Sequence, residues 1–203
     1  MNAIDFVRKL RMRWIMQLNW IKGKPLKIVV GAAGVSQPSW IATEMNSLDL
    51  TRQEDFNFLF GGVERIDAIL AEHVWEHLDE HDGRRGLRNC FNYLKPGAYL
   101  RLAVPDGFHP DPAYIDYVRP GGSGVGADDH KVLYTVESLT VAARDCGFEC
   151  FSLEHWDALG NFHERPWDTE SGFVQRSKRF DERNSDGELK YTSLIIDAVK
   201  PRR

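Results

Sequence analysis

The chain of 203 residues is long enough for one domain with a substantial core and too short for two comfortable ones. Its composition, 42% hydrophobic and 28% charged, is that of a globular protein and excludes fibrous, low-complexity and mucin-like classes. No apolar run approaches the roughly 20 residues that span a bilayer. Arginines interrupt every apolar stretch near the N-terminus, so we expect neither a membrane span nor a secretory signal, and a cytoplasmic location.

Charge is distributed unevenly along the chain. The net charge is −4, but residues 1–24 carry six Lys or Arg against one acid, which makes this segment +5 and the remainder −9. Phosphate binding needs a basic surface. We therefore expect no nucleic-acid partner for the acidic body of the protein.

Residues 1–24 are predicted to form an amphipathic helix. Between Asn2 and Ile21 apolar residues recur at spacings of three and four, and Gly23 and Pro25 end the pattern. These apolar residues are Ile4, Val7, Leu10, Trp14, Leu18 and Ile21. A basic amphipathic helix can lie on an anionic membrane or on a partner. We favour a helix packed on the domain with solvated Arg and Lys on its outer face, and regard it as a possible homodimer element.

Short apolar runs alternate with helical segments in residues 25–203, which we predict to form a single domain. The predicted strands are 26–30, 40–45, 48–50, 66–71, 99–104, 148–153 and 191–199, and the predicted helices are 76–94 and 136–146. This alternation indicates an α/β domain with a mainly parallel sheet. The polar stretch 157–189 offers no crossover helix, so we expect the last two strands to be antiparallel.

Open α/β sheets bind ligands outside the carboxyl ends of their strands, so the residues that follow each strand are the first candidates for a site. The first predicted strand ends in the small residues Gly31–Gly34, which allow a ligand to approach the backbone closely. Glu44, near the end of the second, suits two ribose hydroxyls. Asp49 and Leu50 suit a polar and an apolar contact to adenine. Each also has a structural explanation as a turn, an exposed glutamate or a loop acid.

Two further stretches, 72–78 and 104–109, follow the next predicted strands and bring ionisable groups to the same end of the sheet. Histidine titrates near neutral pH, which suits a general base. The candidates for that role are His73, Asp106, His109 and His130. For any single one of them, a role as a hydrogen-bonded structural residue is the more common case. The glycine-rich loop 121–127 precedes the last candidate and suggests a mobile lid.

A competing metal motif overlaps these residues. His73-Val74-Trp75-Glu76-His77 matches H-x-x-E-H, in which two histidines one helical turn apart bind zinc. The pattern must lie within a helix, whereas His73 falls at a strand-to-helix junction. The three cysteines, Cys90, Cys146 and Cys150, are spaced for neither a disulfide framework nor a zinc site. We therefore assign no metal ligand.

Longer motifs carry a family resemblance. They are Glu-His-Val-Trp-Glu-His-Leu at 72–78, Asn-Tyr-Leu-Lys-Pro-Gly at 92–97 and Leu-Arg-Leu-Ala-Val-Pro-Asp at 100–106. This combination resembles class I S-adenosylmethionine-dependent methyltransferases. It is most similar to a subgroup of small bacterial-type methyltransferases with Leu-Glu-His after strand four and Leu-Lys-Pro-Gly-Gly before strand five. Stretches 129–139, 172–177 and 192–200 extend the resemblance over nearly the whole chain after Pro25.

The resemblance implies a Rossmann-like fold, with a mainly parallel seven-stranded sheet and an antiparallel C-terminal strand, and S-adenosylmethionine as cofactor. It implies that Gly31 and Ala33, with Ala32 between them, lie under the methionine and ribose parts of the cofactor. Glu44 would hold the ribose, and Asp49 and Leu50 would flank the adenine. Glu72 and His73 would face the sulfonium. Ala33 departs from the family's Gly-x-Gly pattern. Ala98 departs from its Gly-Gly turn.

The function expected from these observations is methyl transfer from S-adenosylmethionine to an unidentified small-molecule acceptor, with sugars among the candidates. His73, Asp106 and His130 are the residues expected to carry catalysis. Aromatic residues of the late polar stretch would line a ring pocket or anchor the stretch to the core; they are Trp156, Phe162, Trp167 and Phe173. The alternative is a non-catalytic, partner-binding module with weak or lost cofactor binding, which Ala33 favours.

Overall fold

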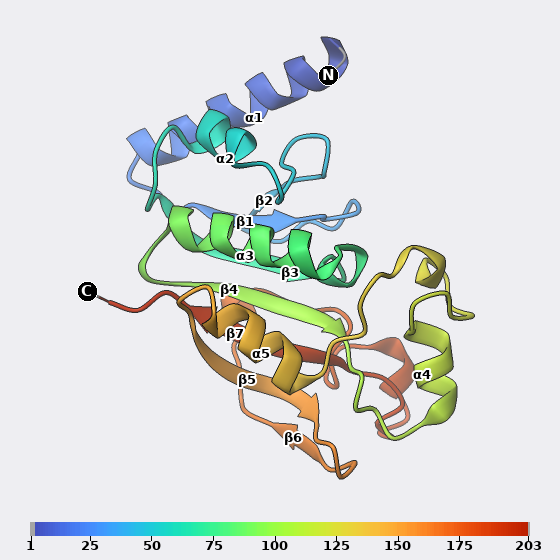
Figure 1. Cartoon of the computed structure of the whole chain (residues 1–203). Helices are drawn as coiled ribbons and strands as arrows, with labels where there is room; N and C mark the ends of the chain where they lie inside the picture. The colour runs from blue at the N-terminus through green and yellow to red at the C-terminus, as the bar shows by residue number, and fades with distance from the viewer. Residues whose placement is uncertain (1–2, 203) are drawn as a thin grey trace.

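The computed structural model describes residues 3–202, and the side chains of residues 5–202 (Figure 1). Asn2, where we expected the first helix to begin, the Ile4 side chain and Arg203 lie outside the described residues. The strands are β1 Lys27–Val30, β2 Ile41–Ala42, β3 Ile66–Glu72, β4 Leu94–Pro105, β5 Glu149–Trp156, β6 Phe162–Glu164 and β7 Ser193–Val199. The helices are α1 Ala3–Ile21, α2 Gln53–Phe60, α3 Glu80–Tyr93, α4 Pro112–Val118 and α5 Val136–Arg144. Four single turns of 3₁₀-helix are η1 Trp75–His77, η2 Ala127–Asp129, η3 Thr169–Ser171 and η4 Glu182–Asn184.

All seven strands form one sheet in the order β2-β1-β3-β4-β7-β5-β6. Strands β2, β1, β3 and β4 are parallel, and β7 runs antiparallel between β4 and β5. This confirms the predicted α/β sheet, with its mainly parallel strands and an antiparallel C-terminal strand. After β1 the chain forms β2 on one side of β1, and it then forms β3 on the other side of β1. The carboxyl ends of β1 and β3 therefore flank a switch point, where α/β sheets bind ligands.

The strand residues alternate between two cores because successive side chains point to opposite faces of a sheet. Ile28 and Val30 join the larger core, which α1, α2, α3 and α5 cover. Val29, between them, joins a smaller core on the opposite face. In Figure 1, α3 and α5 lie in front of the sheet, and α1 and α2 lie at its β1–β2 end.

A single buried arginine anchors the covering of the smaller core. Arg101 on β4 is 2% exposed, and its Nε and Nη2 each donate to one oxygen of Asp197 on β7 at 2.8 Å. Its Nη1 donates to the carbonyls of Gly172 at 2.7 Å and Asp168 at 3.2 Å. The guanidinium also lies 5.1 Å from the ring of Trp167. These contacts hold the late polar segment, rather than a helix, against this face.

Several predicted boundaries are wrong because tertiary contacts override local pattern. The predicted strand 48–50 is a turn, in which the Ser47 and Leu48 amides donate to the Glu44 carbonyl. The predicted strand 40–45 is reduced to β2. The predicted helix 76–94 is interrupted after η1, and α3 begins beyond the N-cap Asp79, which accepts from the Asp82 amide at 2.8 Å.

Other expectations hold more closely. The predicted helix 136–146 corresponds to α5, which Thr135 caps in a reciprocal capping box with Ser138. The predicted strands 26–30, 66–71, 99–104, 148–153 and 191–199 correspond to β1, β3, β4, β5 and β7 with shifted ends. Helices α2 and α4 and the edge strand β6 were not predicted.

The predicted N-terminal helix is present as α1 and packs on the domain with Arg8 and Arg11 exposed, but most of the apolar residues of the predicted pattern do not form the contact. Val7, Leu10, Trp14 and Ile21 face solvent, and the side that contacts the domain carries Met16 and the ammonium of Lys9. Within residues 3–202, none of the helices combines the length and apolar character that crossing a bilayer requires.

The Arg101–Asp197 pair yields a stability prediction. Arg101→Met should lower the free energy of unfolding by about 3 kcal/mol, because it leaves Asp197 and two backbone carbonyls without their donor in a buried setting. Arg101→Met combined with Asp197→Leu should recover part of that loss. Urea unfolding measures both effects. The matched control is Arg119→Met, which removes an exposed pair with Asp116 and should change stability by less than about 1 kcal/mol. An equal effect of the two single substitutions would contradict the anchoring role.

Candidate functional site

A cavity of about 430 Å³ opens at the carboxyl ends of β1 and β3. Its walls come from the β1 end, the 45–51 turn, the β3–α3 connection and η2. The lining residues are Val30, Gly31, Met45, Leu48, Asp49, Leu50, Thr51, His73, Val74, His77, Leu78, Asp82 and Asp129. The sheet order places this cavity at the switch point between β1 and β3, so we call it the switch-point cavity.

Gly31 terminates β1 in a conformation that requires glycine. Its φ is +58°, in the left-handed region, and a Cβ at this position would lie 2.6 Å from Cγ2 of Val74. Two chain segments thus meet closely at the cavity wall, and the backbone of Gly31 is accessible to a ligand. This close approach to the backbone was predicted from the small residues 31–34.

The 45–51 turn is held by a chain of charged and polar contacts. Asp49 accepts from the amide of Thr51 at 2.9 Å and from its hydroxyl at 2.7 Å, while its own amide donates to Asp55 at 3.0 Å. The other Asp55 oxygen lies 2.6 Å from Nζ of Lys9 on α1. We call this the Lys9–Asp55–Asp49 chain. It fixes Asp49 and the adjoining Leu50 as one wall of the cavity.

His73 occupies a strained position immediately after β3, with φ +54°. Its Nδ1 lies 3.0 Å from Oε1 of Glu76, and its Nε2 lies 3.0 Å from the buried Oγ of Ser193. With Nδ1–H donating to the carboxylate, Nε2 accepts from the serine hydroxyl. Burial alone would raise the pKa of Glu76, but the neighbouring His73 charge and hydrogen bond lower the pKa below its usual value. The imidazole is therefore held between a carboxylate and a hydroxyl at the cavity wall.

A second histidine, His77, also lines the cavity, and the sequence analysis did not select it. Its Nδ1 lies 3.3 Å from Oδ2 of Asp129, and its ring meets that of His130 edge-on at 4.8 Å. His130 is not among the residues that line the cavity, and its Nδ1 lies 2.7 Å from the carbonyl oxygen of Val118. The signal for His77 was its position four residues after His73 in the same motif.

One group of side chains here has donor atoms suited to a divalent cation. A Glu76 oxygen and a nitrogen from each of His77 and His130 lie within 4.8 Å of one another. Glu76 would then have to share its carboxylate between the cation and His73. The H-x-x-E-H protease interpretation is wrong, because His73 precedes η1 and has a left-handed backbone, so His73 and His77 do not share a helix face.

Other residues proposed for cofactor contact lie beside this cavity. Glu44 is exposed, accepts from the Gly34 amide at 3.4 Å, and lines two neighbouring clefts along α1. Ala32 is buried in the smaller core. Ala33 is exposed, and its φ of +46° lies in the left-handed region that favours glycine. Glu72 is engaged elsewhere, since it accepts from the amide of Arg176 at 2.7 Å on the opposite face of the sheet.

Asp106 and His109 belong to a different, buried cluster. The oxygens of Asp106 accept from the amides of Phe108 at 3.0 Å and Trp156 at 2.7 Å. The ring of His109 stacks on that of Tyr114 with centroids 3.9 Å apart. Burial lowers the pKa of His109. Neither side chain lines the switch-point cavity. In this structure both residues tie the end of β4 to its neighbours.

The glycine-rich loop 121–127 is folded against the end of α4. The Ser123 and Gly124 amides donate to the carbonyls of Asp116 and Tyr117 at 3.0 and 2.9 Å. Gly122 and Gly124 lie so near those carbonyls that a Cβ would overlap them. Close packing therefore explains these glycines without the lid that the sequence suggested.

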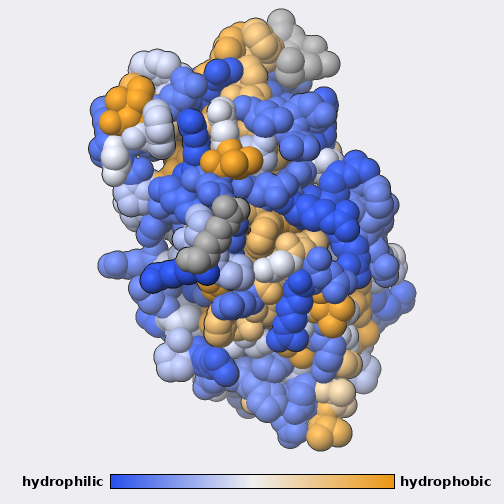
Figure 2. Space-filling view, turned by 60° about the vertical axis from the view of Figure 1, so that its left-hand side comes forward, coloured by the Kyte–Doolittle hydropathy of each residue, from blue (hydrophilic) through white to orange (hydrophobic). Residues whose placement is uncertain are grey.

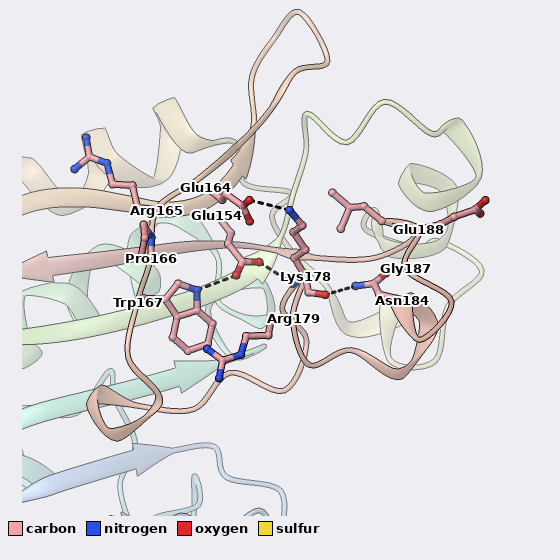
Figure 3. Close-up of a pocket in the computed structure, with 11 residues that line it drawn as sticks. Glu154, Glu164, Arg165, Pro166, Trp167, Lys178, Arg179, Asn184, Gly187 and Glu188 are labelled. Carbon is pink, nitrogen blue, oxygen red and sulfur yellow. Dashed lines mark hydrogen bonds and ion pairs between the residues drawn. The ribbon is translucent and has the colours of Figure 1, made fainter.

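A larger cavity, of about 750 Å³, lies toward the opposite edge of the sheet, beside β5 and β6 (Figure 3). Its polar lining is mostly self-paired: Glu154 accepts from Trp167 Nε1 and from the Lys178 amide, and Lys178 Nζ binds Glu164. Strands β4 and β7 separate this cavity from the switch point. Four aromatic residues were expected either to line a ring pocket or to anchor the late polar stretch; of these, Trp167 lines this cavity and also contacts Arg101.

No protein-family model and no curated protein sequence matches the chain. Among solved structures, a methyltransferase from Thermotoga maritima, described as S-adenosylmethionine-dependent and a possible histamine N-methyltransferase, aligns with TM-score 0.50 and 13% identity over 98% of this chain and 95% of that chain. An S-adenosylmethionine-dependent methyltransferase from Archaeoglobus fulgidus aligns with TM-score 0.47 and 16% identity over 97% and 94% of the two chains. The chain therefore has the class I S-adenosylmethionine-dependent methyltransferase fold, as the sequence resemblance implied.

Ala33 provides a test of the cofactor loop. Ala33→Gly should raise the free energy of unfolding by about 1 kcal/mol, because glycine relieves the cost of a left-handed alanine. The control is Ala32→Gly, which removes a methyl group buried in the smaller core and should destabilise the protein. Thermal or urea unfolding distinguishes the two. Destabilisation by Ala33→Gly would show that the loop has another conformation in solution.

Asp106 gives a pH prediction. Burial raises its pKa to about 6, against the opposing effect of the Trp156 and Phe108 amides. Because the folded state holds this proton more tightly than the unfolded state, its contribution to stability is present at low pH and is lost as pH rises through about 6. Relative to Asp106→Asn, the wild type should gain roughly 2 kcal/mol of unfolding free energy between about pH 7 and pH 4. Parallel urea titrations measure this difference, and a pH-independent difference would contradict it.

Proposed function

We propose that this protein transfers a methyl group from S-adenosylmethionine to a small-molecule acceptor. The observation that carries the proposal is the switch-point cavity, which combines a glycine-bounded backbone, a carboxylate and a histidine at the carboxyl ends of adjacent parallel strands. Its position is the one at which open α/β sheets bind nucleotide-like ligands. Among the residues predicted to bind cofactor, Gly31, Asp49, Leu50 and His73 line it together.

The residues present suit the parts of this cofactor. The exposed backbone at Gly31 lets the amino-acid and ribose parts approach without a side chain between them. Leu50 and Leu48 offer an apolar wall for the adenine, and Asp49, fixed by Thr51, offers an acceptor for its amino group. Glu44 borders the adjoining cleft, which shares Met45 and Asp49 with the cavity, and suits the ribose hydroxyls.

When bound, the cofactor supplies an activated methyl group on a positively charged sulfur, so the main task of the protein is alignment. His73 is the group we assign to the acceptor. Glu76 orients the imidazole through Nδ1 and leaves the Nε2 lone pair available. An acceptor hydroxyl in place of the Ser193 hydroxyl would give up its proton to Nε2. His77, with Asp129, forms the facing wall and contributes to acceptor contact.

Calorimetric titration with S-adenosylmethionine and S-adenosylhomocysteine tests cofactor binding directly. We expect saturable one-site binding of both ligands, weakened at least about tenfold in Glu44→Gln through loss of charge-assisted hydrogen bonds to the ribose. The matched control is Glu149→Gln, an exposed glutamate at the start of β5, which should leave affinity unchanged. Folded protein that binds neither ligand would refute the proposal and favour a non-catalytic, partner-binding module.

His73→Ala separates chemistry from binding. It should leave cofactor affinity within a fewfold of wild type and lower the rate of S-adenosylhomocysteine formation, with a sugar and polyol acceptor panel, by about 10² or more. Glu76→Gln should reproduce part of that loss because it removes the carboxylate that orients the ring. An unchanged rate in His73→Ala would transfer the role to His77.

A further inference from the structure

Helix α1 presents its more apolar face to solvent. Val7 is 62% exposed, Leu10 43%, Trp14 63% and Ile21 72%. At the helical repeat these four residues form one stripe along the helix. Figure 2 shows hydrophobic residues gathered at the N-terminal end of the molecule, beside the grey terminal atoms. We call this stripe the α1 apolar face.

The opposite side of α1 is fixed to the domain by contacts that leave this face uncovered. Lys9 pairs with the buried carboxylate of Asp55 at 2.6 Å, and Met16, 2% exposed, enters the larger core. At the edge of the helix, the guanidinium of Arg13 lies 5.0 Å from the ring of Phe58. The helix is therefore held in one orientation, so substitutions on the α1 apolar face need not disturb the fold.

Basic residues flank the α1 apolar face. Arg8 and Arg11 are exposed beside it, and Lys22 and Lys24 follow its C-terminal end. The segment 1–24 has a net charge of +5, whereas the remainder of the chain is −9. Pairing of this face with a second copy would bring two such basic segments together, which is unfavourable. An anionic surface with an apolar interior complements both the charge and the apolar stripe.

We propose that α1 lies flat in the interface of an anionic lipid membrane, with the α1 apolar face among the acyl chains and its basic residues among the headgroups. This attachment is peripheral, since no described helix is apolar enough to cross the bilayer. One cleft along α1 shares Met45 and Asp49 with the switch-point cavity.

Vesicle co-sedimentation of the full chain tests the proposal. We expect the protein to sediment with vesicles of phosphatidylglycerol and phosphatidylcholine, and to remain in solution with phosphatidylcholine alone. Arg8→Gln with Arg11→Gln should lower partitioning by about an order of magnitude. Leu10→Ser with Trp14→Ser should abolish it. The matched control, Leu159→Ser, removes an apolar side chain 87% exposed in the β5–β6 loop and should have no effect. Circular dichroism confirms that each variant folds.

Light scattering on the same proteins measures their oligomeric state and shows whether a second copy of the chain, rather than a membrane, covers the α1 apolar face. A monomeric wild type that binds anionic vesicles supports the proposal. A dimer that dissociates in the Leu10→Ser, Trp14→Ser variant and ignores vesicles assigns the face to a second copy and overturns it. Equal binding to neutral and anionic vesicles, or no vesicle binding by the wild type, also overturns it.

Discussion

The buried guanidinium of Arg101 is the constraint on which the rest of the structure depends. By binding Asp197 and the carbonyl of Gly172, it holds the late polar segment against a sheet face that none of the described α-helices covers. Four residues after Gly172, the backbone amide of Arg176 donates to the Glu72 carboxylate. The backbone carbonyl of Arg176 accepts from the Ser193 amide. Glu72 precedes His73, and Ser193 binds the His73 ring. The fixed position of the histidine at the switch point thus depends on a segment secured from β4.

The sequence predicted those parts of the fold that depend on short apolar runs. Buried strands such as β1, β3 and β7 are mostly apolar. The wrong assignments fall where partners are distant. The predicted strand 48–50 is a turn because Asp55 binds the Asp49 amide and Asn89 on α3 binds the Leu50 carbonyl. No local pattern contains such contacts.

The same distinction separates the site residues that the sequence found from those it misplaced. Gly31 and His73 directly follow strand ends, and parallel strand ends converge by geometry. Glu72 was misplaced because the amides of Gln175 and Arg176, about a hundred residues away, occupy its carboxylate. Asp106 was misplaced because an amide fifty residues away, that of Trp156, occupies its carboxylate. A position near a strand end in the sequence shows at which end of the sheet a side chain lies. It does not show whether that side chain already binds another part of the protein.

The Lys9–Asp55–Asp49 chain makes the N-terminal helix part of the cavity wall rather than an appendage. One carboxylate accepts from the helix through one oxygen and from the turn through the other. Anything that restrains α1 therefore reduces the conformational freedom of the turn, and a ligand that orders the turn restrains α1 in return. Linkage requires these two effects to be equal in free energy. Surface attachment and ligand occupancy would then act as mutual effectors, with Asp55 as the thermodynamic link between two surfaces that never touch.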